Sequence, residues 1–461
     1  MAYLNDLAAA DVPAHIHLLV KTNQWKGLIQ ALDDGLPANV VVEDMPLLEY
    51  VAQAMELRRT RYQLDVPAAP LELLDAFIRN GLEKAEMDDD GTTAVGLACL
   101  CGQWQWAKHL VEAGFCVESK QPYTVQTLSL LLLGRFRRMV VEREDNTHDE
   151  PEESSGVGQT QGNVHPLTPG DATRVRRRKV AVDSPAEQGR VMEIICFLAQ
   201  HGACVDLPSV PDITEWDDQF DEADVAADYL LAMEEAEPEI EDEGEPHPGD
   251  APLFQAIRAL DEVAVEALLA AGASLTASMG EVIPGGRPLE FAIYRDSSKI
   301  VQLLLQAGAP TGKDPHLSEA FARGQQPLVL AAHLGRDRLI PWLLEAMESD
   351  EVGEAAKLAM QLATAYDRVD CMKTLHLLGV PLDITSDTDG YTLLHRAAEA
   401  GSGGAVEYLL EAGLDWKTLS ENGVSAAEVL LRNHPDLARI YGVDQLVPVN
   451  NVRVLGRRKG S

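Results

Sequence analysis

The chain has 461 residues, a formal net charge of -36, 46% hydrophobic residues and only 5% aromatic residues. This acidity argues against general nucleic-acid binding, which needs a basic surface to replace the counterions of phosphates, and against adhesion to anionic membranes. The length allows two or three domains or one long repeat array, and the low aromatic content favours packing of helices through small residues.

Six cysteines are spread along the chain: Cys99, Cys101, Cys116, Cys196, Cys204 and Cys371. None belongs to a CxxC pair, so a zinc site of the usual spacing is not indicated. Most lie in apolar runs, so we interpret them as buried free thiols, which fit a reducing compartment. The first residues lack the basic region and long apolar core of a signal peptide. We therefore expect a cytoplasmic protein.

The first part of the chain, residues 1–134, repeats one pattern. Each copy has a turn with glycine, a short helix with small residues on one face, a tight glycine turn and a second helix with an apolar pair. Neither helix can bury its apolar face alone, so the copies must stack on each other. The copies run through residues 16–39, 45–82 (with an inserted loop) and 88–115, and a fourth begins at 124–134.

Two segments break the pattern. Residues 135–188 are rich in Ser, Gly, Thr, Pro and acids, so we predict a disordered insertion within the fourth repeat, which residues 189–210 complete. Basic clusters at both ends of the insertion are interpreted as solvated loop ends, as elements that dock on an acidic surface, or as a nuclear-localisation signal. Residues 211–249 are acidic and contain Trp216 and Phe220. We predict a flexible segment that is either a linker or a ligand for a basic groove.

Further copies fill residues 250–442, and residues 443–461 form a C-terminal tail. Equivalent glycines recur about every 33 to 39 residues, which is the period of a helix-pair repeat. The most regular copy, residues 387–415, reads DTDGYTLLHRAAEAGSGGAVEYLLEAGLD and aligns without a gap to residues 88–115.

This copy resembles the ankyrin repeat family, whose motif is Asp-x-x-Gly-x-Thr-Pro-Leu-His-x-Ala-Ala, then Gly, then Leu-Leu-x-x-Gly-Ala. It matches nearly all of the motif, with Leu393 where proline is usual, and degenerate arrays of this kind resemble those of many bacterial proteins. The resemblance implies an all-α solenoid of about ten helix-turn-helix repeats, with short β-turn tips and two irregular insertions.

The resemblance also implies a structural role for four residues of the opening turn: Asp387, Gly390, Thr392 and His395. Thr392 and His395 are expected to bond to each other and to the backbone, which satisfies amides at the start of the first helix. Other copies replace the histidine, so we interpret it as a turn residue and not as a shared reagent. The replacements are Gly96, Phe254, Glu290, Val329 and Gln361.

Motifs of catalytic or cofactor sites are absent from the sequence. It has no phosphate-binding P-loop, no HExxH and no GxSxG. Acidic residues are so abundant that paired carboxylates carry no information. We therefore predict no catalytic, cofactor-binding or metal-binding residues.

Candidate partner-binding residues follow the small residues of the first helices, on the expected concave face: Arg258, Tyr294, Arg295, His333, Tyr366, Glu399 and Arg432. Tyr391 lies at a turn tip. Aromatic residues and arginine dominate many protein interfaces.

These residues predict a monomeric, non-enzymatic scaffold or adaptor. Its concave face and turn tips would bind an acidic peptide of a partner or the chain's own acidic segment. The acidic segment would in turn bind a basic partner. The alternatives are a bacterial toxin-neutralising (immunity) or effector-associated protein and, more remotely, a hydrolase with a site between repeats.

Overall fold

The computed structural model describes most of the chain and divides it into two compact units. The first unit contains residues 1–208 and 242–273, and the second contains residues 209–241 and 274–461. The described residues are 12–42, 45–61, 70–84, 92–119, 126–146, 185–206, 250–277, 286–313, 326–349, 351–386 and 390–443.

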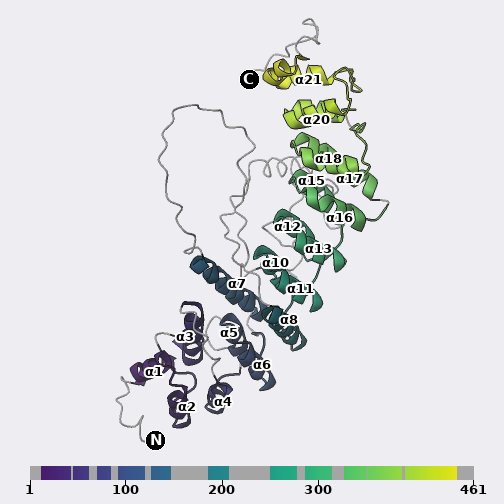
Figure 1. Ribbon diagram of the computed structural model, residues 1–461. Helices are drawn as coiled ribbons and strands as arrows, with labels where there is room; N and C mark the ends of the chain where they lie inside the picture. Colours follow the sequence, from purple (N-terminus) through teal and green to yellow (C-terminus); the bar gives the residue numbers. More distant parts are fainter. Residues whose placement is uncertain are drawn as a thin grey trace, which may run out of the picture. The chain divides into compact units, whose positions relative to one another are not determined.

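The described part of the first unit consists of five helix pairs and one short hairpin (Figure 1). The pairs are α1 (Val12–Lys21) with α2 (Trp25–Asp33), α3 (Leu47–Arg61) with α4 (Leu71–Arg79), α5 (Ala94–Leu100) with α6 (Trp104–Glu112), α7 (Thr127–Asn146) with α8 (Pro185–Gln200), and α10 (Pro252–Arg258) with α11 (Glu262–Ala270). Strands β1 (Val41–Val42) and β2 (Met45–Pro46) pair antiparallel. First helices pack on first helices, as α5 does on α7, and second helices on second helices, as α8 does on α11.

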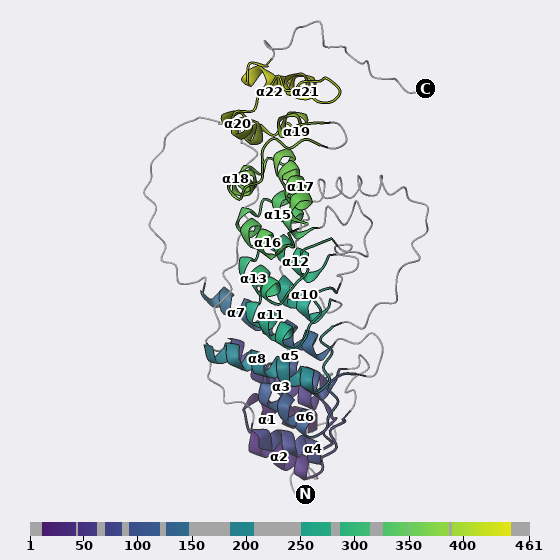
Figure 2. The ribbon, with the colours of Figure 1, turned by 90° about the vertical axis from the view of Figure 1, so that its right-hand side faces the viewer.

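The described part of the second unit consists of five more helix pairs. They are α12 (Pro288–Tyr294) with α13 (Ser298–Gln306), α15 (Pro327–His333) with η2 (Asp337–Leu339) and α16 (Ile340–Ala346), α17 (Val352–Ala365) with α18 (Val369–Leu377), α19 (Leu393–Ala400) with α20 (Gly403–Glu411), and α21 (Ala426–Asn433) with α22 (Pro435–Ile440). Figure 2 shows first helices stacked in one column and second helices in a column beside it.

Small residues explain why these short helices pack so closely. In α19 the pair Ala397–Ala398 is buried, and in α20 Val406 and Leu409 are buried. Each helix is too short to be stable alone in water, so the packing of its apolar face holds it in place. The second helix then ends at a glycine such as Gly413, whose φ of 94° is costly for residues with a Cβ. The predicted all-α, helix-pair repeat fold is confirmed within each unit.

Helix α7 is longer than the sequence analysis implied. It continues to Asn146, and α8 begins at Pro185, so helix extends into both ends of the segment predicted as a disordered insertion. The run RFRRMVVERE after Gly134 lacks Gly and Pro and contains good helix formers, which explains the extension. Residues 147–184 and 207–249 lie outside the described residues, so the disordered insertion and the acidic flexible segment stay predictions.

Helices α5 and α7 approach each other through a glycine. A Cβ added to Gly134 would lie 1.8 Å from the backbone oxygen of Leu100, at the end of α5. Real Cβ atoms essentially never lie under 3.0 Å from another heavy atom. Glycine is therefore what allows this helix crossing.

A polar seam joins α7 to the α10–α11 pair. Arg135 donates from Nε and Nη2 to the two carboxylate oxygens of Asp261, the latter at 3.1 Å, and both side chains are buried. Gln255 Nε2 donates to Ser129 Oγ at 2.8 Å and to the backbone oxygen of Asp250 at 2.7 Å. Buried donor groups need partners, and the seam supplies them to Arg135 and to Gln255 Nε2 across a long stretch of sequence.

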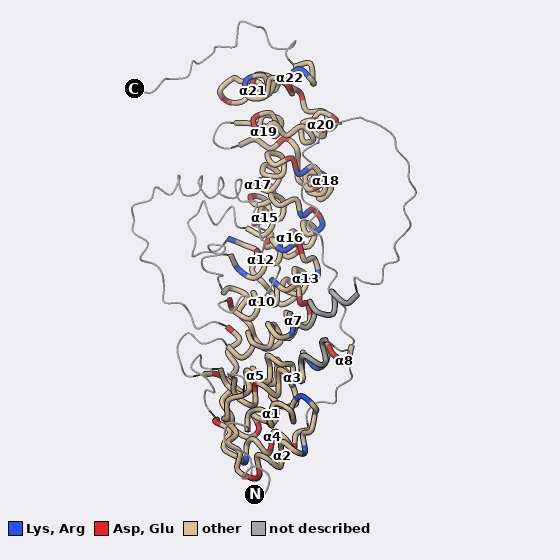
Figure 3. The backbone as a smooth tube through the Cα atoms, turned by 90° about the vertical axis from the view of Figure 1, so that its left-hand side faces the viewer, with Lys and Arg blue, Asp and Glu red and all other residues tan. Residues whose placement is uncertain are grey.

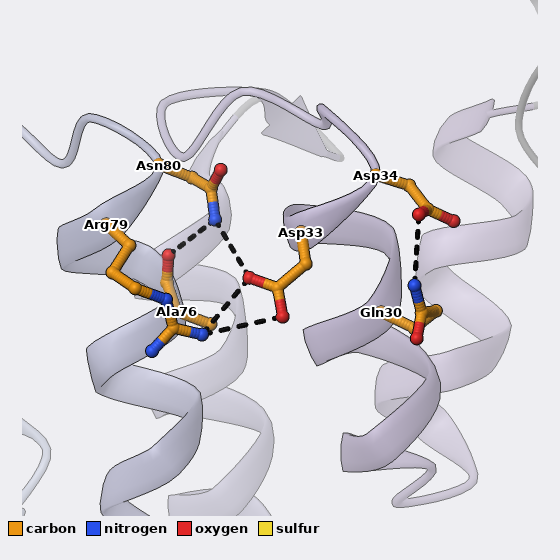
Figure 4. Close-up of polar contacts among 6 residues, drawn as sticks. All are labelled: Gln30, Asp33, Asp34, Ala76, Arg79 and Asn80. Carbon is orange, nitrogen blue, oxygen red and sulfur yellow. Dashed lines mark hydrogen bonds and ion pairs between the residues drawn. The ribbon is translucent and has the colours of Figure 1, made fainter. Parts of the chain in front are cut away.

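Neighbouring second helices also exchange polar contacts, as α2 and α4 do in Figure 4. Asp33 accepts hydrogen bonds from Arg79 Nη2 at 3.1 Å and from Asn80 Nδ2 at 3.4 Å. Gln30 donates to Asp34 at 3.0 Å within α2. Arg79 and Asp33 are largely exposed, so this pair contributes little to stability.

Candidate partner-binding surface

The turn before α19 contains the most regular motif of the sequence. Thr392 is the N-cap of α19, and its side chain accepts from the His395 amide at 3.4 Å while His395 Nδ1 accepts from the Thr392 amide at 3.3 Å. Because Nδ1 is an acceptor, Nε2 carries the proton that is donated to the Val424 backbone oxygen at 3.0 Å. The His395 side chain is fully buried. Its contacts thus link one repeat to the next.

The rest of this turn fits the same role. Gly390 has a φ of 65°, and a Cβ there would lie 2.8 Å from the backbone nitrogen of Glu421. Thr385 and Thr392 form an isolated antiparallel bridge at the turn tip. Asp387, which the motif places in the same turn, lies outside the described residues.

Other repeats fix the equivalent turn with different chemistry. Ser425 and Glu428 form a second reciprocal cap at the start of α21. Arg287 and Glu290 occupy the Thr and His positions before α12 and form a buried ion pair, with Arg287 Nε donating to Glu290 Oε1 at 2.8 Å. Burial raises the pKa of the Glu290 carboxyl, and the Arg287 guanidinium opposes this shift. The repeat motif did not predict this ion pair, although Arg287 and Glu290 have the same spacing of three residues as Thr392 and His395.

Arg258 does not occupy the position expected of a binding residue. It ends α10, as the register predicts, but its side chain is only 7% exposed and its Nη2 donates to Asp250 Oδ2 at 2.6 Å. Asp250 lies eight residues earlier, before the start of α10, so the Arg258 side chain reaches back along the helix to it. The positive charge of Arg258 is therefore neutralised within the first unit, and we remove it from the candidate surface.

The remaining residues of the expected ladder recur where first helices end in the second unit. Tyr294 ends α12, Arg295 is its C-cap residue, His333 ends α15, and Tyr366 is the C-cap residue of α17. All four are half-buried. The rings of His333 and Tyr366 come from neighbouring repeats and lie 4.3 Å apart between centroids.

An arginine that the sequence analysis missed completes this cluster. Arg368 is exposed, and its Nε donates to the His333 backbone oxygen at 3.0 Å. Burial lowers the pKa of His333, and the Arg368 guanidinium lowers it further. The imidazole is therefore uncharged at neutral pH and presents an aromatic face. Arg368 could have been found from its place two residues after Tyr366 in the same turn.

The turns that follow these helix ends carry charges of both signs. Asp296 pairs with Arg336 of the next repeat at 3.5 Å, and Arg338 is exposed. Asp367 accepts from the amides of Gly404 and Ala405 at the start of α20, the second at 2.6 Å. Lys and Arg are thus interspersed with Asp and Glu along the second unit (Figure 3).

The last candidates fall into two groups. Glu399 and Arg432 are exposed near the ends of α19 and α21, and Glu399 pairs with Arg396 at 2.9 Å. Tyr391 lies at the opposite end of α19, where its ring stacks on His395 at 5.1 Å and under the Arg396 guanidinium at 5.4 Å. The structure therefore does not bring Tyr391 together with the others. We call the others, with Arg368, the turn row: Tyr294, Arg295, His333, Tyr366, Arg368, Glu399 and Arg432.

Three further observations bear on chemistry. Among the residues that the structure describes, no group of three or more His, Cys, Asp or Glu side chains is placed to hold a metal ion. Cys99, Cys101 and Cys371 are buried as predicted, whereas the other three cysteines are half-buried. No helix in the described ranges is both long and apolar enough to span a bilayer.

Comparisons with known proteins identify one family over part of the chain. A family model of ankyrin repeats, three copies, matches residues 328–420, which include the helix pairs from α15 to α20. The human ASB11 ankyrin repeat domain is 25% identical, with 41% of this chain and 82% of that chain covered at a TM-score of 0.33. The ankyrin repeat domain of Bcl-3, a unique member of the IkappaB protein family, is 23% identical, with 43% and 86% covered at a TM-score of 0.35. A comparison with curated protein sequences gives no match. The capped turns, the helix pairs and the matched family model show that the chain contains ankyrin repeats at residues 328–420.

Proposed function

We propose that this protein is a non-enzymatic adaptor whose turn row binds an acidic segment of a protein partner. Ankyrin repeats are protein-interaction modules. The observation that carries the proposal is the cluster of His333, Tyr366 and Arg368, in which two neighbouring repeats present two rings in tilted contact beside an exposed guanidinium. Such a surface fits an aromatic or aliphatic side chain flanked by carboxylates.

Charge supports this choice of ligand. The chain as a whole has a net charge of -36, yet the turns of the second unit expose Arg338, Arg368 and Arg432 and half-expose Arg295. Electrostatic complementarity raises association rates and excludes partners of the wrong sign. An acidic peptide is therefore attracted to these turns although most of the protein repels it.

The chain contains one segment of this chemistry, residues 211–249. We extend the proposal to an autoinhibited state in which this segment occupies the turn row and a partner displaces it. The sequence supports this idea because the segment joins acids to Trp216 and Phe220.

The test uses a fluorescent synthetic peptide with the sequence of residues 211–249 and the full-length protein. Charge reversal at Arg295 and Arg368 together is expected to weaken binding about tenfold or more, since both guanidinium groups would oppose the peptide. The matched control reverses Arg190 and Arg439, exposed arginines on second helices, and should change binding less than about twofold. Equal binding by both double variants would refute the proposal. Unchanged protease sensitivity of residues 211–249 in the first variant would refute the autoinhibited state.

The other predicted functions have their own tests. A toxin-neutralising or effector-associated role stays a prediction, and a growth-rescue assay with a co-expressed basic toxin would test it. A metal-content measurement with a broad hydrolase screen would test the proposed lack of enzymatic activity. Cell fractionation would test the proposed cytoplasmic location.

A further inference from the structure

Two adjacent leucines at the end of α18 face the solvent. Leu377 is 88% exposed and Leu378 is 48% exposed, and Leu377 is the last residue of the helix before the Gly379 turn. We call this pair the leucine edge. Isolated exposed leucines are common on protein surfaces. An exposed pair is significant only if the same positions of the other second helices lack apolar residues.

The equivalent positions of other second helices are small or polar. The two residues before the closing turn are Gln306–Ala307 in α13, Glu345–Ala346 in α16 and Glu411–Ala412 in α20. The repeat therefore folds and stacks without an apolar side chain here. The buried residues of α18 are Cys371, Met372 and Leu375, so the core of this repeat does not depend on Leu377.

The leucine edge lies in an acidic setting. In the column of second helices, α16 lies on one side of α18 and α20 on the other (Figure 2), so Glu345 and Glu411 flank Leu377 in register. Both glutamates are exposed. Asp383 and Asp415 are exposed in the segments that follow α18 and α20.

Cations near the leucine edge are few in the described part of this unit. Lys373 lies one turn earlier in α18 and pairs with Asp370 at 3.5 Å, and Lys417 is exposed beyond α20. The acidic groups around the leucines therefore outnumber the basic ones. This setting disfavours an acidic partner or an anionic membrane and favours a basic one.

We propose that the leucine edge is a second docking surface, which binds a cationic amphipathic segment of a protein partner. An aliphatic or aromatic side chain of the partner packs on Leu377 and Leu378, and flanking Lys or Arg residues pair with Glu345 and Glu411. Packed helices lie about 8–10 Å apart, which corresponds to about six residues along a partner helix. The nearest spacing that keeps residues on one face of a helix is about seven, so the expected motif is an apolar anchor with basic residues about seven positions before and after it.

A second apolar residue extends this surface. Ile440, 73% exposed, ends α22 two repeats further on, where α20 has a polar Glu407. Two helix spacings place it roughly 20 Å from Leu377. A partner helix of about four turns can contact both, with Glu411 between the two apolar contacts.

This surface is distinct from the turn row. The turn row lies where second helices begin, and the leucine edge lies where they end. Helix α18 has nine residues, so the two surfaces are about 13 Å apart along the helix axis. One protein can therefore hold an acidic segment and a basic segment at the same time.

The test measures binding of a labelled synthetic helical peptide, built from Leu anchors with Lys at the flanking positions, to the full-length protein. Changing Leu377 and Leu378 together to Gln is expected to weaken binding about tenfold or more, because the apolar contact is lost. Glu345→Lys with Glu411→Lys should weaken it by a similar factor, and salt should weaken it in the parent protein. Reversal of Arg295 and Arg368 should leave it unchanged.

The matched control is Leu419→Gln, which removes a leucine that is 61% exposed elsewhere in the unit and should not affect binding. All these side chains are exposed, so the variants should fold, and circular dichroism checks this. Equal binding by the Leu377/Leu378 variant, equal loss with Leu419→Gln, or equal binding of a peptide with Glu in place of Lys would overturn the proposal. Light scattering tests whether a second copy of the chain occupies the leucine edge instead. A dimer that becomes monomeric in the Leu377/Leu378 variant would show this, and it would also overturn the proposal.

Discussion

Gly134 provides a sharp test of the packing in the first unit. A Cβ at this position would lie 1.8 Å from the Leu100 oxygen, so Gly134→Ala must move α7 away from α5 by more than 1 Å to reach an ordinary contact. Such overpacking costs about 3 kcal/mol, and the better helix propensity of alanine returns about 1 kcal/mol. We expect a net loss of about 2 kcal/mol in the free energy of unfolding.

A glycine in the partner helix provides the control. Gly189 lies within α8, is exposed, and has nothing within 4 Å of an added Cβ. Gly189→Ala should therefore raise stability by about 0.5–1 kcal/mol. Urea unfolding followed by circular dichroism at fixed temperature measures both variants. A Gly134→Ala protein as stable as the parent would refute the close approach of α5 and α7.

Three further predictions concern the second unit. His395→Ala should lower stability by about 2–4 kcal/mol, because it empties a buried site and removes the hydrogen bonds of the imidazole with the Thr392 amide and the Val424 oxygen. Thermal unfolding measures this, and a variant that keeps its stability but loses peptide binding would contradict a structural role. The pKa of His333 is lowered below 6.5 in the folded state, so the unfolded chain binds more protons than the folded protein at mildly acidic pH. The free energy of unfolding should therefore fall as the pH drops below 6.5. A His333→Asn variant with the same pH dependence would argue against this cause. Burial raises the pKa of the Cys371 thiol to about 12, so a disulfide reagent at neutral pH should label it only after unfolding; mass spectrometry of the labelled native protein checks this.

The repeat fold was predictable because its signals are local. Glycines such as Gly413 mark helix ends, and the Thr392–His395 pair marks a helix start, each within a few residues of sequence. These signals recur at one period, so the stacking of helix pairs follows from them. The two long segments without repeats were recognisable by composition, but composition averages over a segment and therefore missed the helical run after Gly134.

The candidate surface was less predictable because it depends on contacts between distant residues. The repeat register alone predicts that Arg258 and His333 occupy equivalent positions at the ends of first helices. Arg258 is buried in an ion pair with Asp250, whereas His333 is half-buried and its backbone oxygen accepts from Arg368. Neither contact follows from a repeat pattern. The leucine edge was also missed, since apolar residues in a helical repeat are read as core. Only a comparison with Glu345 and Glu411 at the same position shows that Leu377 is an exception.

The polar seam between α7 and α10 has a consequence for synthesis of the protein. Ser129 and Arg135 find their partners, Gln255 and Asp261, 126 residues later in the chain. At translation rates of about 5–20 residues per second, the ribosome needs roughly 6–25 s to supply them. An apolar face left waiting that long would invite aggregation, whereas a serine and an arginine stay hydrated until their partners arrive. The seam thus suits a nascent chain that must complete this repeat late.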